Sequence, residues 1–204
     1  MLRWASFVSL FLLSAAQASA APLSVRVVDA KGQPVRDAVV TLHAAGGASR
    51  PAPSGNYSVS QKDMQFYPFV LVVPVGAKVS FPNFDPTRHH VYSFSPAKQF
   101  ELKLFAKDQS RSVTFDKPGV VALGCNIHDA MTAFIYVSDT QYTARTGANG
   151  VARFANAPAG KISVWHPYLR AKGNVVERQV AANDRNESFT VALRAPPMAM
   201  SNDY

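Results

Sequence analysis

Short strand-like runs rich in apolar residues, separated by turn signals, recur along this chain from residue 23 onward. Residues 23–28 alternate apolar and polar side chains, a turn follows at 29–32, and residues 38–42 form a second run. Such strands at short spacing, each with one apolar face, favour a β-sandwich. Further runs lie at residues 70–73, 78–81, 100–105, 111–115, 120–123, 133–137, 151–154, 161–165, 175–180 and 187–193. No useful helical periodicity follows residue 20, so the sequence predicts an all-β protein.

The first twenty residues have the pattern of a secretory signal peptide. Arg3 supplies a positive start, residues 7–13 an apolar core, and residues 18–20 a small-residue cleavage site. The apolar stretch is too short to span a bilayer, and no other run approaches spanning length. We therefore expect a periplasmic or otherwise exported protein, cleaved after Ala20 and without a stable membrane span. An uncleaved anchor is disfavoured because no basic stop-transfer segment follows.

The chain is basic, with 21 lysines and arginines against 13 acids and a net charge of +8. The predicted signal peptide holds one arginine and no acid, so the mature chain would carry +7. No more than two basic residues are adjacent, and a nucleic-acid-binding protein would need a concentrated basic stripe. The charge is compatible with an acidic protein partner, and equally with an ordinary soluble surface.

The only cysteine lies at residues 124–131, Gly-Cys-Asn-Ile-His-Asp-Ala-Met. A lone cysteine in an exported protein suggests an intermolecular bridge, a reactive thiol or a metal ligand. Cys125, His128 and Met131, spaced C-x2-H-x2-M, can reach one ion from a single loop, and His89 supplies a second imidazole from upstream. Two imidazoles and a thiolate with a weak axial thioether form the ligand set of a copper electron-transfer site. We predict one copper ion, cycling between Cu(I) and Cu(II), at these four residues.

Several alternatives stay open for this site. His90 points away from His89 if both lie on an extended strand, but the two could exchange as ligand. Asn83 and Asp85 are interpreted as loop-fixing residues, with carboxylate ligation by Asp85 as a minor alternative. His43 and His166 lack neighbouring ligand-type residues and are interpreted as structural. Met198 and Met200 lie in the proline-containing carboxy-terminal segment. A transient role in handling copper is an alternative for them, but a terminus without such a role is favoured.

Other chemistries fit the residues less well. A cysteine that is only a small buried hydrophobe would leave both the C-x2-H-x2-M spacing and the upstream histidine as coincidences. Structural zinc needs four strong ligands and catalytic zinc an open position with water, and an axial methionine suits neither. The chain has no G-x-S-x-G, and a Cys125–His128 nucleophile pair would lack an orienting group. We therefore expect no enzymatic activity and no catalytic residue.

Residues 61–138 resemble the cupredoxins, and most closely the amicyanin and plastocyanin-like branch. The resemblance includes the F-x-P of residues 66–68, the V-G-x-x-V-x-F of 75–81, the N-x-D-x-x-x-H-x-V of 83–91, the turn at 115–119 and the short ligand loop at 124–131. It implies a Greek-key β-sandwich with His89, Cys125, His128 and Met131 as copper ligands. It also implies that the exposed ring edge of His128 is the electron port.

The chain departs from the pattern of that family at two positions. His90 stands where the family often has Asn or Thr, whose side chain can help to fix the ligand loop. Asp129 follows the second histidine where amicyanins commonly have proline. An acidic group beside an exposed imidazole could alter docking or redox potential.

The flanking segments resemble a transthyretin-like sandwich, the carboxypeptidase regulatory-like domain. Residues 28–40 are similar to its first hairpin, and residues 147–154 and 157–161 to its later turns. The resemblance implies a cupredoxin inserted into a carrier domain, as in bacterial periplasmic proteins labelled methylamine utilisation proteins. The predicted organisation is a signal peptide at 1–20, carrier segments at 21–56 and 139–195, the cupredoxin at 57–138 and a flexible tail at 196–204.

Together these features predict an exported copper protein that carries single electrons between redox protein partners, with no role for nucleic acid. A copper-binding protein for delivery or storage is the first alternative, since the same ligands would serve it. A metal-free β-sandwich that binds protein or carbohydrate is the second. The intact set of four ligand-type residues favours copper over this last alternative.

Overall fold

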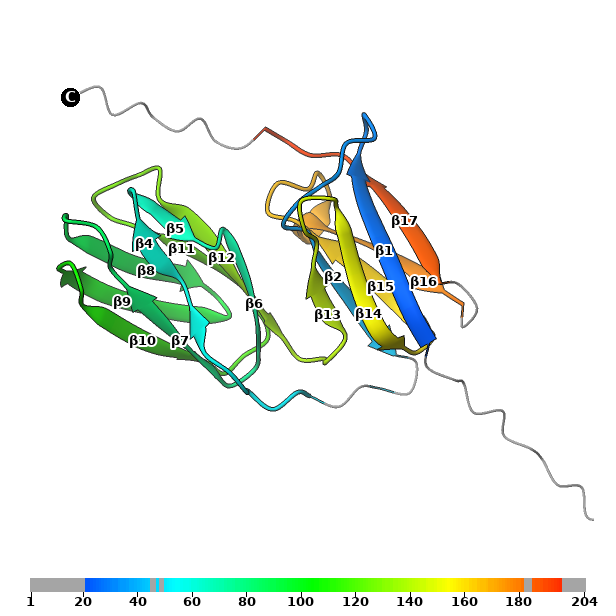
Figure 1. The fold of residues 1–204 in the computed structure, drawn as a ribbon, viewed down its shortest axis with the longest axis horizontal. Helices are drawn as coiled ribbons and strands as arrows, with labels where there is room; N and C mark the ends of the chain where they lie inside the picture. The colour runs from blue at the N-terminus through cyan, green and yellow to red at the C-terminus, as the bar shows by residue number, and fades with distance from the viewer. Residues whose placement is uncertain (1–20, 45–46, 48–49, 182–184, 196–204) are drawn as a thin grey trace, which may run out of the picture.

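The computed structural model describes residues 21–44, 47, 50–181 and 185–195, and these form an all-β protein (Figure 1). The predicted signal peptide and the predicted tail at 196–204 lie outside the described residues. Among the described residues, no helix is long and apolar enough to cross a membrane. The prediction of an all-β sandwich architecture is therefore confirmed.

We call β3 to β12 the central unit. Its strands are β3 (Tyr57–Ser58), β4 (Ser60–Lys62), β5 (Gln65–Tyr67), β6 (Val70–Pro74), β7 (Ala77–Pro82), β8 (His89–Ser95), β9 (Lys98–Phe105), β10 (Ser110–Phe115), β11 (Gly119–Gly124) and β12 (Thr132–Ser138). A five-stranded sheet in the order β6-β12-β11-β8-β9 accompanies a three-stranded sheet, β10-β7-β3, and the β4-β5 hairpin. Alternation is clearest in β7, where Ala77, Val79 and Phe81 are buried. Its core also contains Phe105 and Phe115.

The remaining strands form what we call the flanking unit. They are β1 (Ala21–Asp29), β2 (Val39–Ala44), β13 (Thr143–Arg145), β14 (Val151–Ala157), β15 (Gly160–Trp165), β16 (Val175–Val180) and β17 (Asn186–Val191), with one short 3-10 helix, η1 (Lys172–Asn174). The sheets have the orders β14-β1-β17 and β13-β2-β15-β16. Segments before and after the central unit therefore pair with each other, β1 with β14 and β2 with β15. The unit has its own apolar core, separate from that of the central unit.

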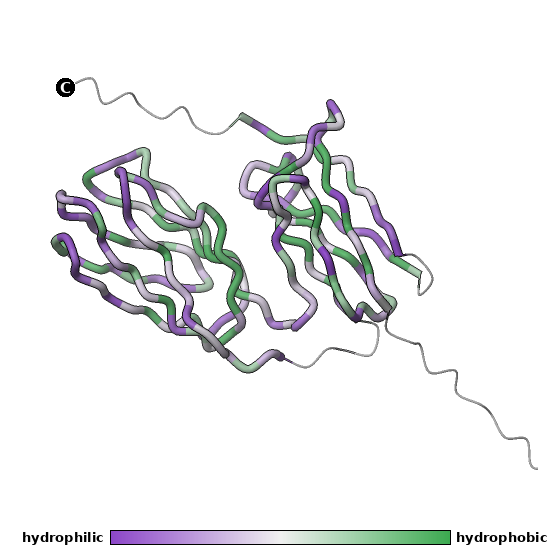
Figure 2. The backbone as a smooth tube through the Cα atoms, viewed as in Figure 1, coloured by the Kyte–Doolittle hydropathy of each residue, from purple (hydrophilic) through white to green (hydrophobic). Residues whose placement is uncertain are grey.

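A third apolar cluster joins the two units. Val39 and Trp165 of the flanking unit pack with Val70 of the central unit, and all three are buried. The Trp165 ring meets Phe134 edge-on, with a centroid distance of 5.8 Å, an arrangement that suits the ring quadrupoles. Figure 2 shows hydrophobic residues, coloured green, along the side of the central unit that faces the flanking unit. The contact holds the two units against each other with aromatic as well as aliphatic surface.

The arrangement of β8, β11 and β12 positions the predicted ligands. β11 pairs with β12 on one side and with β8 on the other. His89 is the first residue of β8, and the C-x2-H-x2-M segment connects β11 to β12. Strand β8 was not predicted from the sequence. In this strand His89, Val91 and Ser93 share one face and are almost fully buried, while His90 on the other face is buried as well.

Acidification is expected to destabilise the flanking unit through His166. This side chain is buried, and burial lowers its pKa, although the charge of Asp37 and a hydrogen bond that the imidazole donates to the Arg36 backbone act in the opposite direction. The unfolded chain therefore binds more protons, so the free energy of unfolding falls as pH drops below the ordinary histidine pKa of 6.5. Urea unfolding midpoints between pH 7.5 and 5.5 should fall less in His166→Asn than in the wild type. Equal pH slopes would contradict this prediction.

Candidate metal centre

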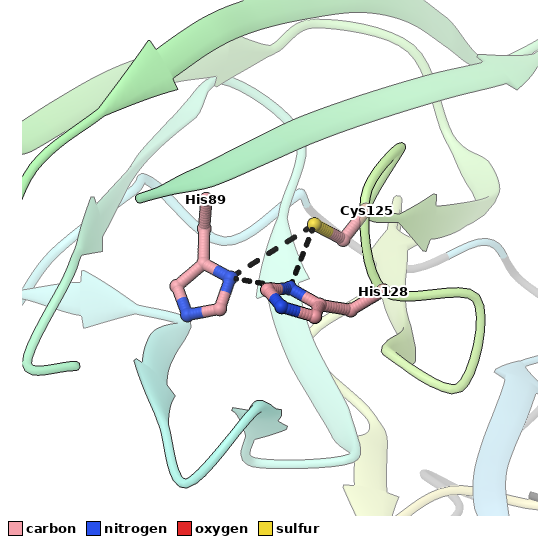
Figure 3. A group of neighbouring side chains, drawn as sticks. All are labelled: His89, Cys125 and His128. Carbon is pink, nitrogen blue, oxygen red and sulfur yellow. Dashed lines mark hydrogen bonds between the residues drawn. The ribbon is translucent and has the colours of Figure 1, made fainter. Parts of the chain in front are cut away.

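Three of the four predicted ligand residues come together in the structure (Figure 3). The Nδ1 atoms of His89 and His128 are 3.2 Å apart, and each lies near the Cys125 Sγ, at 3.9 Å and 3.8 Å respectively. His89 and Cys125 are buried, and His128 is partly exposed. The donor atoms of one side chain from β8 and two from the β11–β12 loop thus face a common point.

These separations suit a single metal ion. Nitrogen and sulfur ligands bond a transition-metal ion at about 2.0–2.3 Å, so donors sharing one ion lie between about 3 and 4 Å from each other. Burial and the neighbouring His89 lower the pKa of the His128 imidazole, which favours the neutral, metal-binding form. An imidazole and a thiolate are the donor types that copper accepts in both oxidation states.

Met131 follows on the same loop and is buried in the same core cluster as Cys125. Its amide donates a 2.9 Å hydrogen bond to the His128 carbonyl, which closes a tight turn between the two residues. The loop therefore carries the thioether inward while the His128 ring stays partly exposed. Axial ligation by Met131 remains a prediction.

A glycine next to the cysteine allows close packing behind the site. A Cβ atom on Gly124 would lie 2.8 Å from the ring of Tyr92, in the paired strand β8. Any other residue would displace the tyrosine ring or the strand that carries Cys125 into the site. Gly124 thus lets the tyrosine lie directly against the backbone beside the predicted thiolate ligand.

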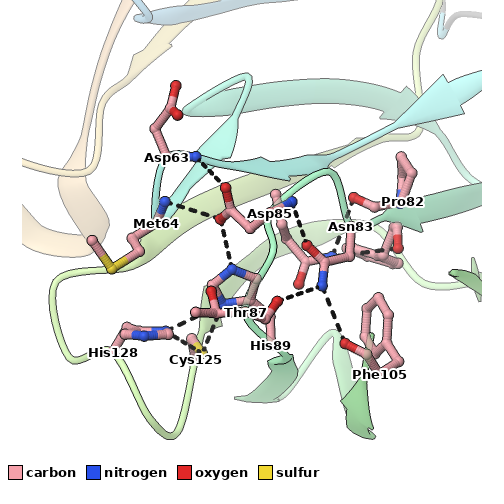
Figure 4. A network of polar contacts seen from close by, with 12 residues as sticks. Asp63, Met64, Pro82, Asn83, Asp85, Thr87, His89, Phe105, Cys125 and His128 are labelled. Atoms are coloured by element: carbon pink, nitrogen blue, oxygen red, sulfur yellow. Dashed lines mark hydrogen bonds and ion pairs between the residues drawn. The ribbon is translucent and has the colours of Figure 1, made fainter. Parts of the chain in front are cut away.

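Asp85 orients the first imidazole rather than joining the donor group (Figure 4). Its Oδ2 atom lies 2.7 Å from Nε2 of His89, on the side of the ring opposite to Cys125. Burial would raise the pKa of Asp85, but the Met64 amide, the His89 imidazole and the Asp63 amide together lower it. The ionised carboxylate favours a proton on Nε2 and leaves the Nδ1 lone pair free for a metal.

The carboxylate is held by a tight turn. The amides of Asp63 and Met64 donate to Asp85 at 2.6 Å and 3.0 Å. Both residues have positive φ, 53° and 52°, as required by the two-residue hairpin turn between β4 and β5. This conformation is costly for a residue as large as methionine, and the two hydrogen bonds to the carboxylate offset that cost.

Asn83 fixes the segment that leads to His89, as the sequence indicated. It is fully buried, and its side-chain amide donates to the carbonyls of Thr87 and Phe105 at 2.9 Å and 3.1 Å. Its oxygen accepts from the Asp85 amide at 2.9 Å. The N-x-D pattern indicated these two residues. The Asp63–Met64 turn gave no sequence signal, because it acts only through backbone amides.

His90 faces away from the donor group. Its Nε2 lies 2.9 Å from Glu101 of β9, and its other nitrogen is buried without a hydrogen-bond partner. The alternation of side chains along β8 accounts for this, because adjacent residues of a strand point to opposite faces. His43 contacts Ser163 in the flanking unit, and His166 is buried there, so neither adjoins the donor group.

Substitution at His90 is therefore expected to leave the metal centre intact. We expect His90→Gln, which can still donate to Glu101, to bind Cu(II) with an unchanged visible and electron paramagnetic resonance spectrum. The matched His89→Gln variant removes a donor that faces Cys125 and should lose that spectrum. The reverse result would identify His90 as the ligand.

Comparisons with protein-family models and with curated proteins find no match for this chain. Among solved structures, a reduced proline variant of amicyanin is 24% identical with a TM-score of 0.38, and the match covers 44% of this chain and 97% of the other. A purple cupredoxin from Nitrosopumilus maritimus is 20% identical with a TM-score of 0.37, over 41% and 100% of the chains. A copper-containing nitrite reductase from Thermus scotoductus is 27% identical with a TM-score of 0.39, over 56% and 28%.

Proposed function

We propose that this chain is an exported copper protein of the cupredoxin type that transfers single electrons between redox partners and is not itself an enzyme. The observation that carries the proposal is the convergence of the His89 and His128 nitrogens and the Cys125 sulfur within 3.9 Å of one another. Met131 would add a weak axial thioether, a role supported by its burial beside Cys125. When bound, the copper ion would supply reversible one-electron chemistry.

The protein supplies the rigidity that fast electron transfer needs. The Asp85 carboxylate contacts the His89 imidazole and accepts hydrogen bonds from two backbone amides. The backbone amide of Asp85 in turn donates to the side-chain oxygen of Asn83. Ligands fixed in this way need to move little when the charge of the ion changes, which keeps the reorganisation energy small. The His128 ring is partly exposed next to Ile127, a largely exposed apolar residue, and this supports an electron port at the loop surface.

We further propose an organisation for the whole chain. The pairing of β1 with β14 and of β2 with β15 supports a carrier sandwich, formed by 21–56 and 139–195, into which a cupredoxin at 57–138 is inserted. The similarity to methylamine utilisation proteins rests on sequence pattern alone and implies no substrate. Export to the periplasm rests on the composition of residues 1–20.

The first experiment is an optical and electron paramagnetic resonance spectrum of the mature protein loaded with Cu(II), followed by voltammetry. An intense visible band that bleaches on reduction, with a reversible one-electron wave, would support electron transfer. Release of Cu(I) to a competing acceptor without a reversible wave would favour copper delivery, the alternative that shares these ligands. A colourless protein that binds only zinc, or no metal, would overturn both.

A further inference from the structure

A cleft of about 1050 Å³ lies between the two units, beside the metal loop. From the flanking unit it is lined by Arg36, Asp37 and Arg145, and from the central unit by residues 63–69 with Ala130 and Thr132. Ala130 and Thr132 are the neighbours of Met131 in the chain. The cleft therefore exists only because both units are present, and it adjoins the loop that carries three of the predicted ligands.

The flanking wall presents guanidinium groups. Arg145 binds the Asp37 carboxylate at 2.5 Å, and Arg36 reaches the other oxygen of the same carboxylate through Nε, at 3.6 Å. Asp37 is largely buried, whereas the Arg36 side chain is 68% exposed. The contact with Asp37 is the one ion pair found for Arg36 within the described part of the chain. Because it uses Nε, the two Nη groups of the guanidinium stay open to a further carboxylate.

The central wall presents mainly apolar and aromatic surface, with Asp63 and Gln65 as its polar members. Met64 and Tyr67 are 47% and 44% exposed, although large hydrophobic side chains are usually buried. Pro68 and the partly buried Phe69 continue this wall. Arginine, methionine and tyrosine facing one another across a concave surface form the composition typical of a protein–protein interface.

This apolar wall is connected to the metal centre by hydrogen bonds. The Met64 amide donates to Asp85, and Asp85 contacts His89, so two contacts of 3.0 Å and 2.7 Å separate the cleft from a predicted ligand. The positive φ of Asp63 and Met64 makes this turn the strained part of the wall. A molecule that moves the turn would change the support of the imidazole.

We propose that this cleft docks a segment of the redox partner in which a carboxylate stands next to a large aromatic side chain. The carboxylate pairs with Arg36, and the aromatic ring lies against Met64 and Tyr67. Within the lining, Asp37 and Asp63 balance Arg36 and Arg145, so the preference for an acidic segment comes from the open Nη groups of Arg36 and from the net positive charge of the whole chain. The identity of the partner as a redox protein rests on the proposed function, but the binding chemistry of the cleft does not.

The test uses three blocked pentapeptides: Gly-Trp-Glu-Glu-Gly, the same peptide with Gln for both Glu residues, and the same peptide with Ala for Trp. They are titrated into the metal-free and the Cu(I)-loaded full-length mature protein, both diamagnetic, and followed by amide NMR. We expect the first peptide to shift the amides of Met64, Phe69 and Thr132. The other two peptides should bind at least about fivefold more weakly, because each lacks one of the two contacts.

The matched variants are Arg36→Glu and Arg153→Glu. Both arginines are exposed, but Arg153 lies on β14 and does not line the cleft. Arg36→Glu should weaken binding of the first peptide by roughly five- to tenfold, and Arg153→Glu by less than about twofold. Unchanged amide dispersion in both variants would show that the fold is retained.

The outcomes separate this inference from the proposed function. No shift at about 5 mM peptide, which would reveal millimolar affinity, or equal weakening by both variants, would overturn the cleft proposal. Self-association through the same residues, with no response to peptide, would also overturn it. Peptide binding by a protein that fails to bind copper would overturn the proposed function and leave the cleft. In copper-loaded protein, bound peptide should lower the reduction potential, since a nearby carboxylate favours Cu(II).

Discussion

Replacing Cys125 with serine is expected to abolish the intense visible absorption of the Cu(II)-loaded protein. That absorption would come from the copper–thiolate bond, and a hydroxyl neither ionises at neutral pH nor donates as a soft ligand. Because Cys125 is the only cysteine, no other thiol can replace it. Copper affinity should fall as well, as measured by competition with a chelator of known affinity.

The matched control is His43→Gln, which changes a histidine of the flanking unit that does not adjoin the donor group. It should retain the full band. Serine for cysteine is a nearly isosteric change, so the variant should stay folded, which circular dichroism checks. A Cys125→Ser protein that keeps an intense band would show that the copper lies elsewhere.

Replacing Asp85 with asparagine should weaken metal binding about 10- to 100-fold, the usual effect of removing the group that orients a ligand histidine. One carboxylate accepts from two backbone amides and contacts His89, and an amide cannot reproduce all three contacts. The donor left unpaired should cost about 1–3 kcal/mol of stability. Chelator competition and urea unfolding of the metal-free protein measure the two effects separately.

The pH dependence gives this prediction a second readout. The pKa of Asp85 is lowered in the fold, so its contribution to stability is present above the ordinary value of 3.8 and is lost as pH falls below it. The Asp85→Asn variant should lack this acid-induced loss of stability. Asp116→Asn, which removes an exposed carboxylate paired with Lys98, is the control for general charge effects and should leave metal affinity unchanged. If the two variants bound the metal with equal affinity, a special role for Asp85 would be contradicted.

Local sequence pattern was sufficient where a short segment decides the outcome. Cys125, His128 and Met131 lie within one loop between adjacent strands, so their spacing limits them to one end of the sheet. The strands with clear alternation, such as β7 and β1, were predicted because burial of one face needs a period of two. The N-x-D pattern likewise indicated Asn83 and Asp85 as residues that fix the loop.

Local pattern was insufficient where two distant segments must meet. The choice between His89 and His90 depends on which face of β8 is turned toward the β11–β12 loop, and a shift of one residue would exchange them. The backbone clamp on Asp85 depends on the approach of the β4–β5 turn, whose amides carry no side-chain signal. The cleft depends on the contact between units through Trp165 and Val70.

The amino-acid sequence by itself determined the all-β class and the residues capable of holding a metal. Both depend on periodicity and spacing within a few residues, where chain geometry leaves little choice. Tertiary structure alone decided which imidazole faces the sulfur, what holds that imidazole, and what surface adjoins the metal loop. These features arise from contacts between residues far apart in the chain, and the packing of two sheets and two units selects one register among many that the local pattern allows.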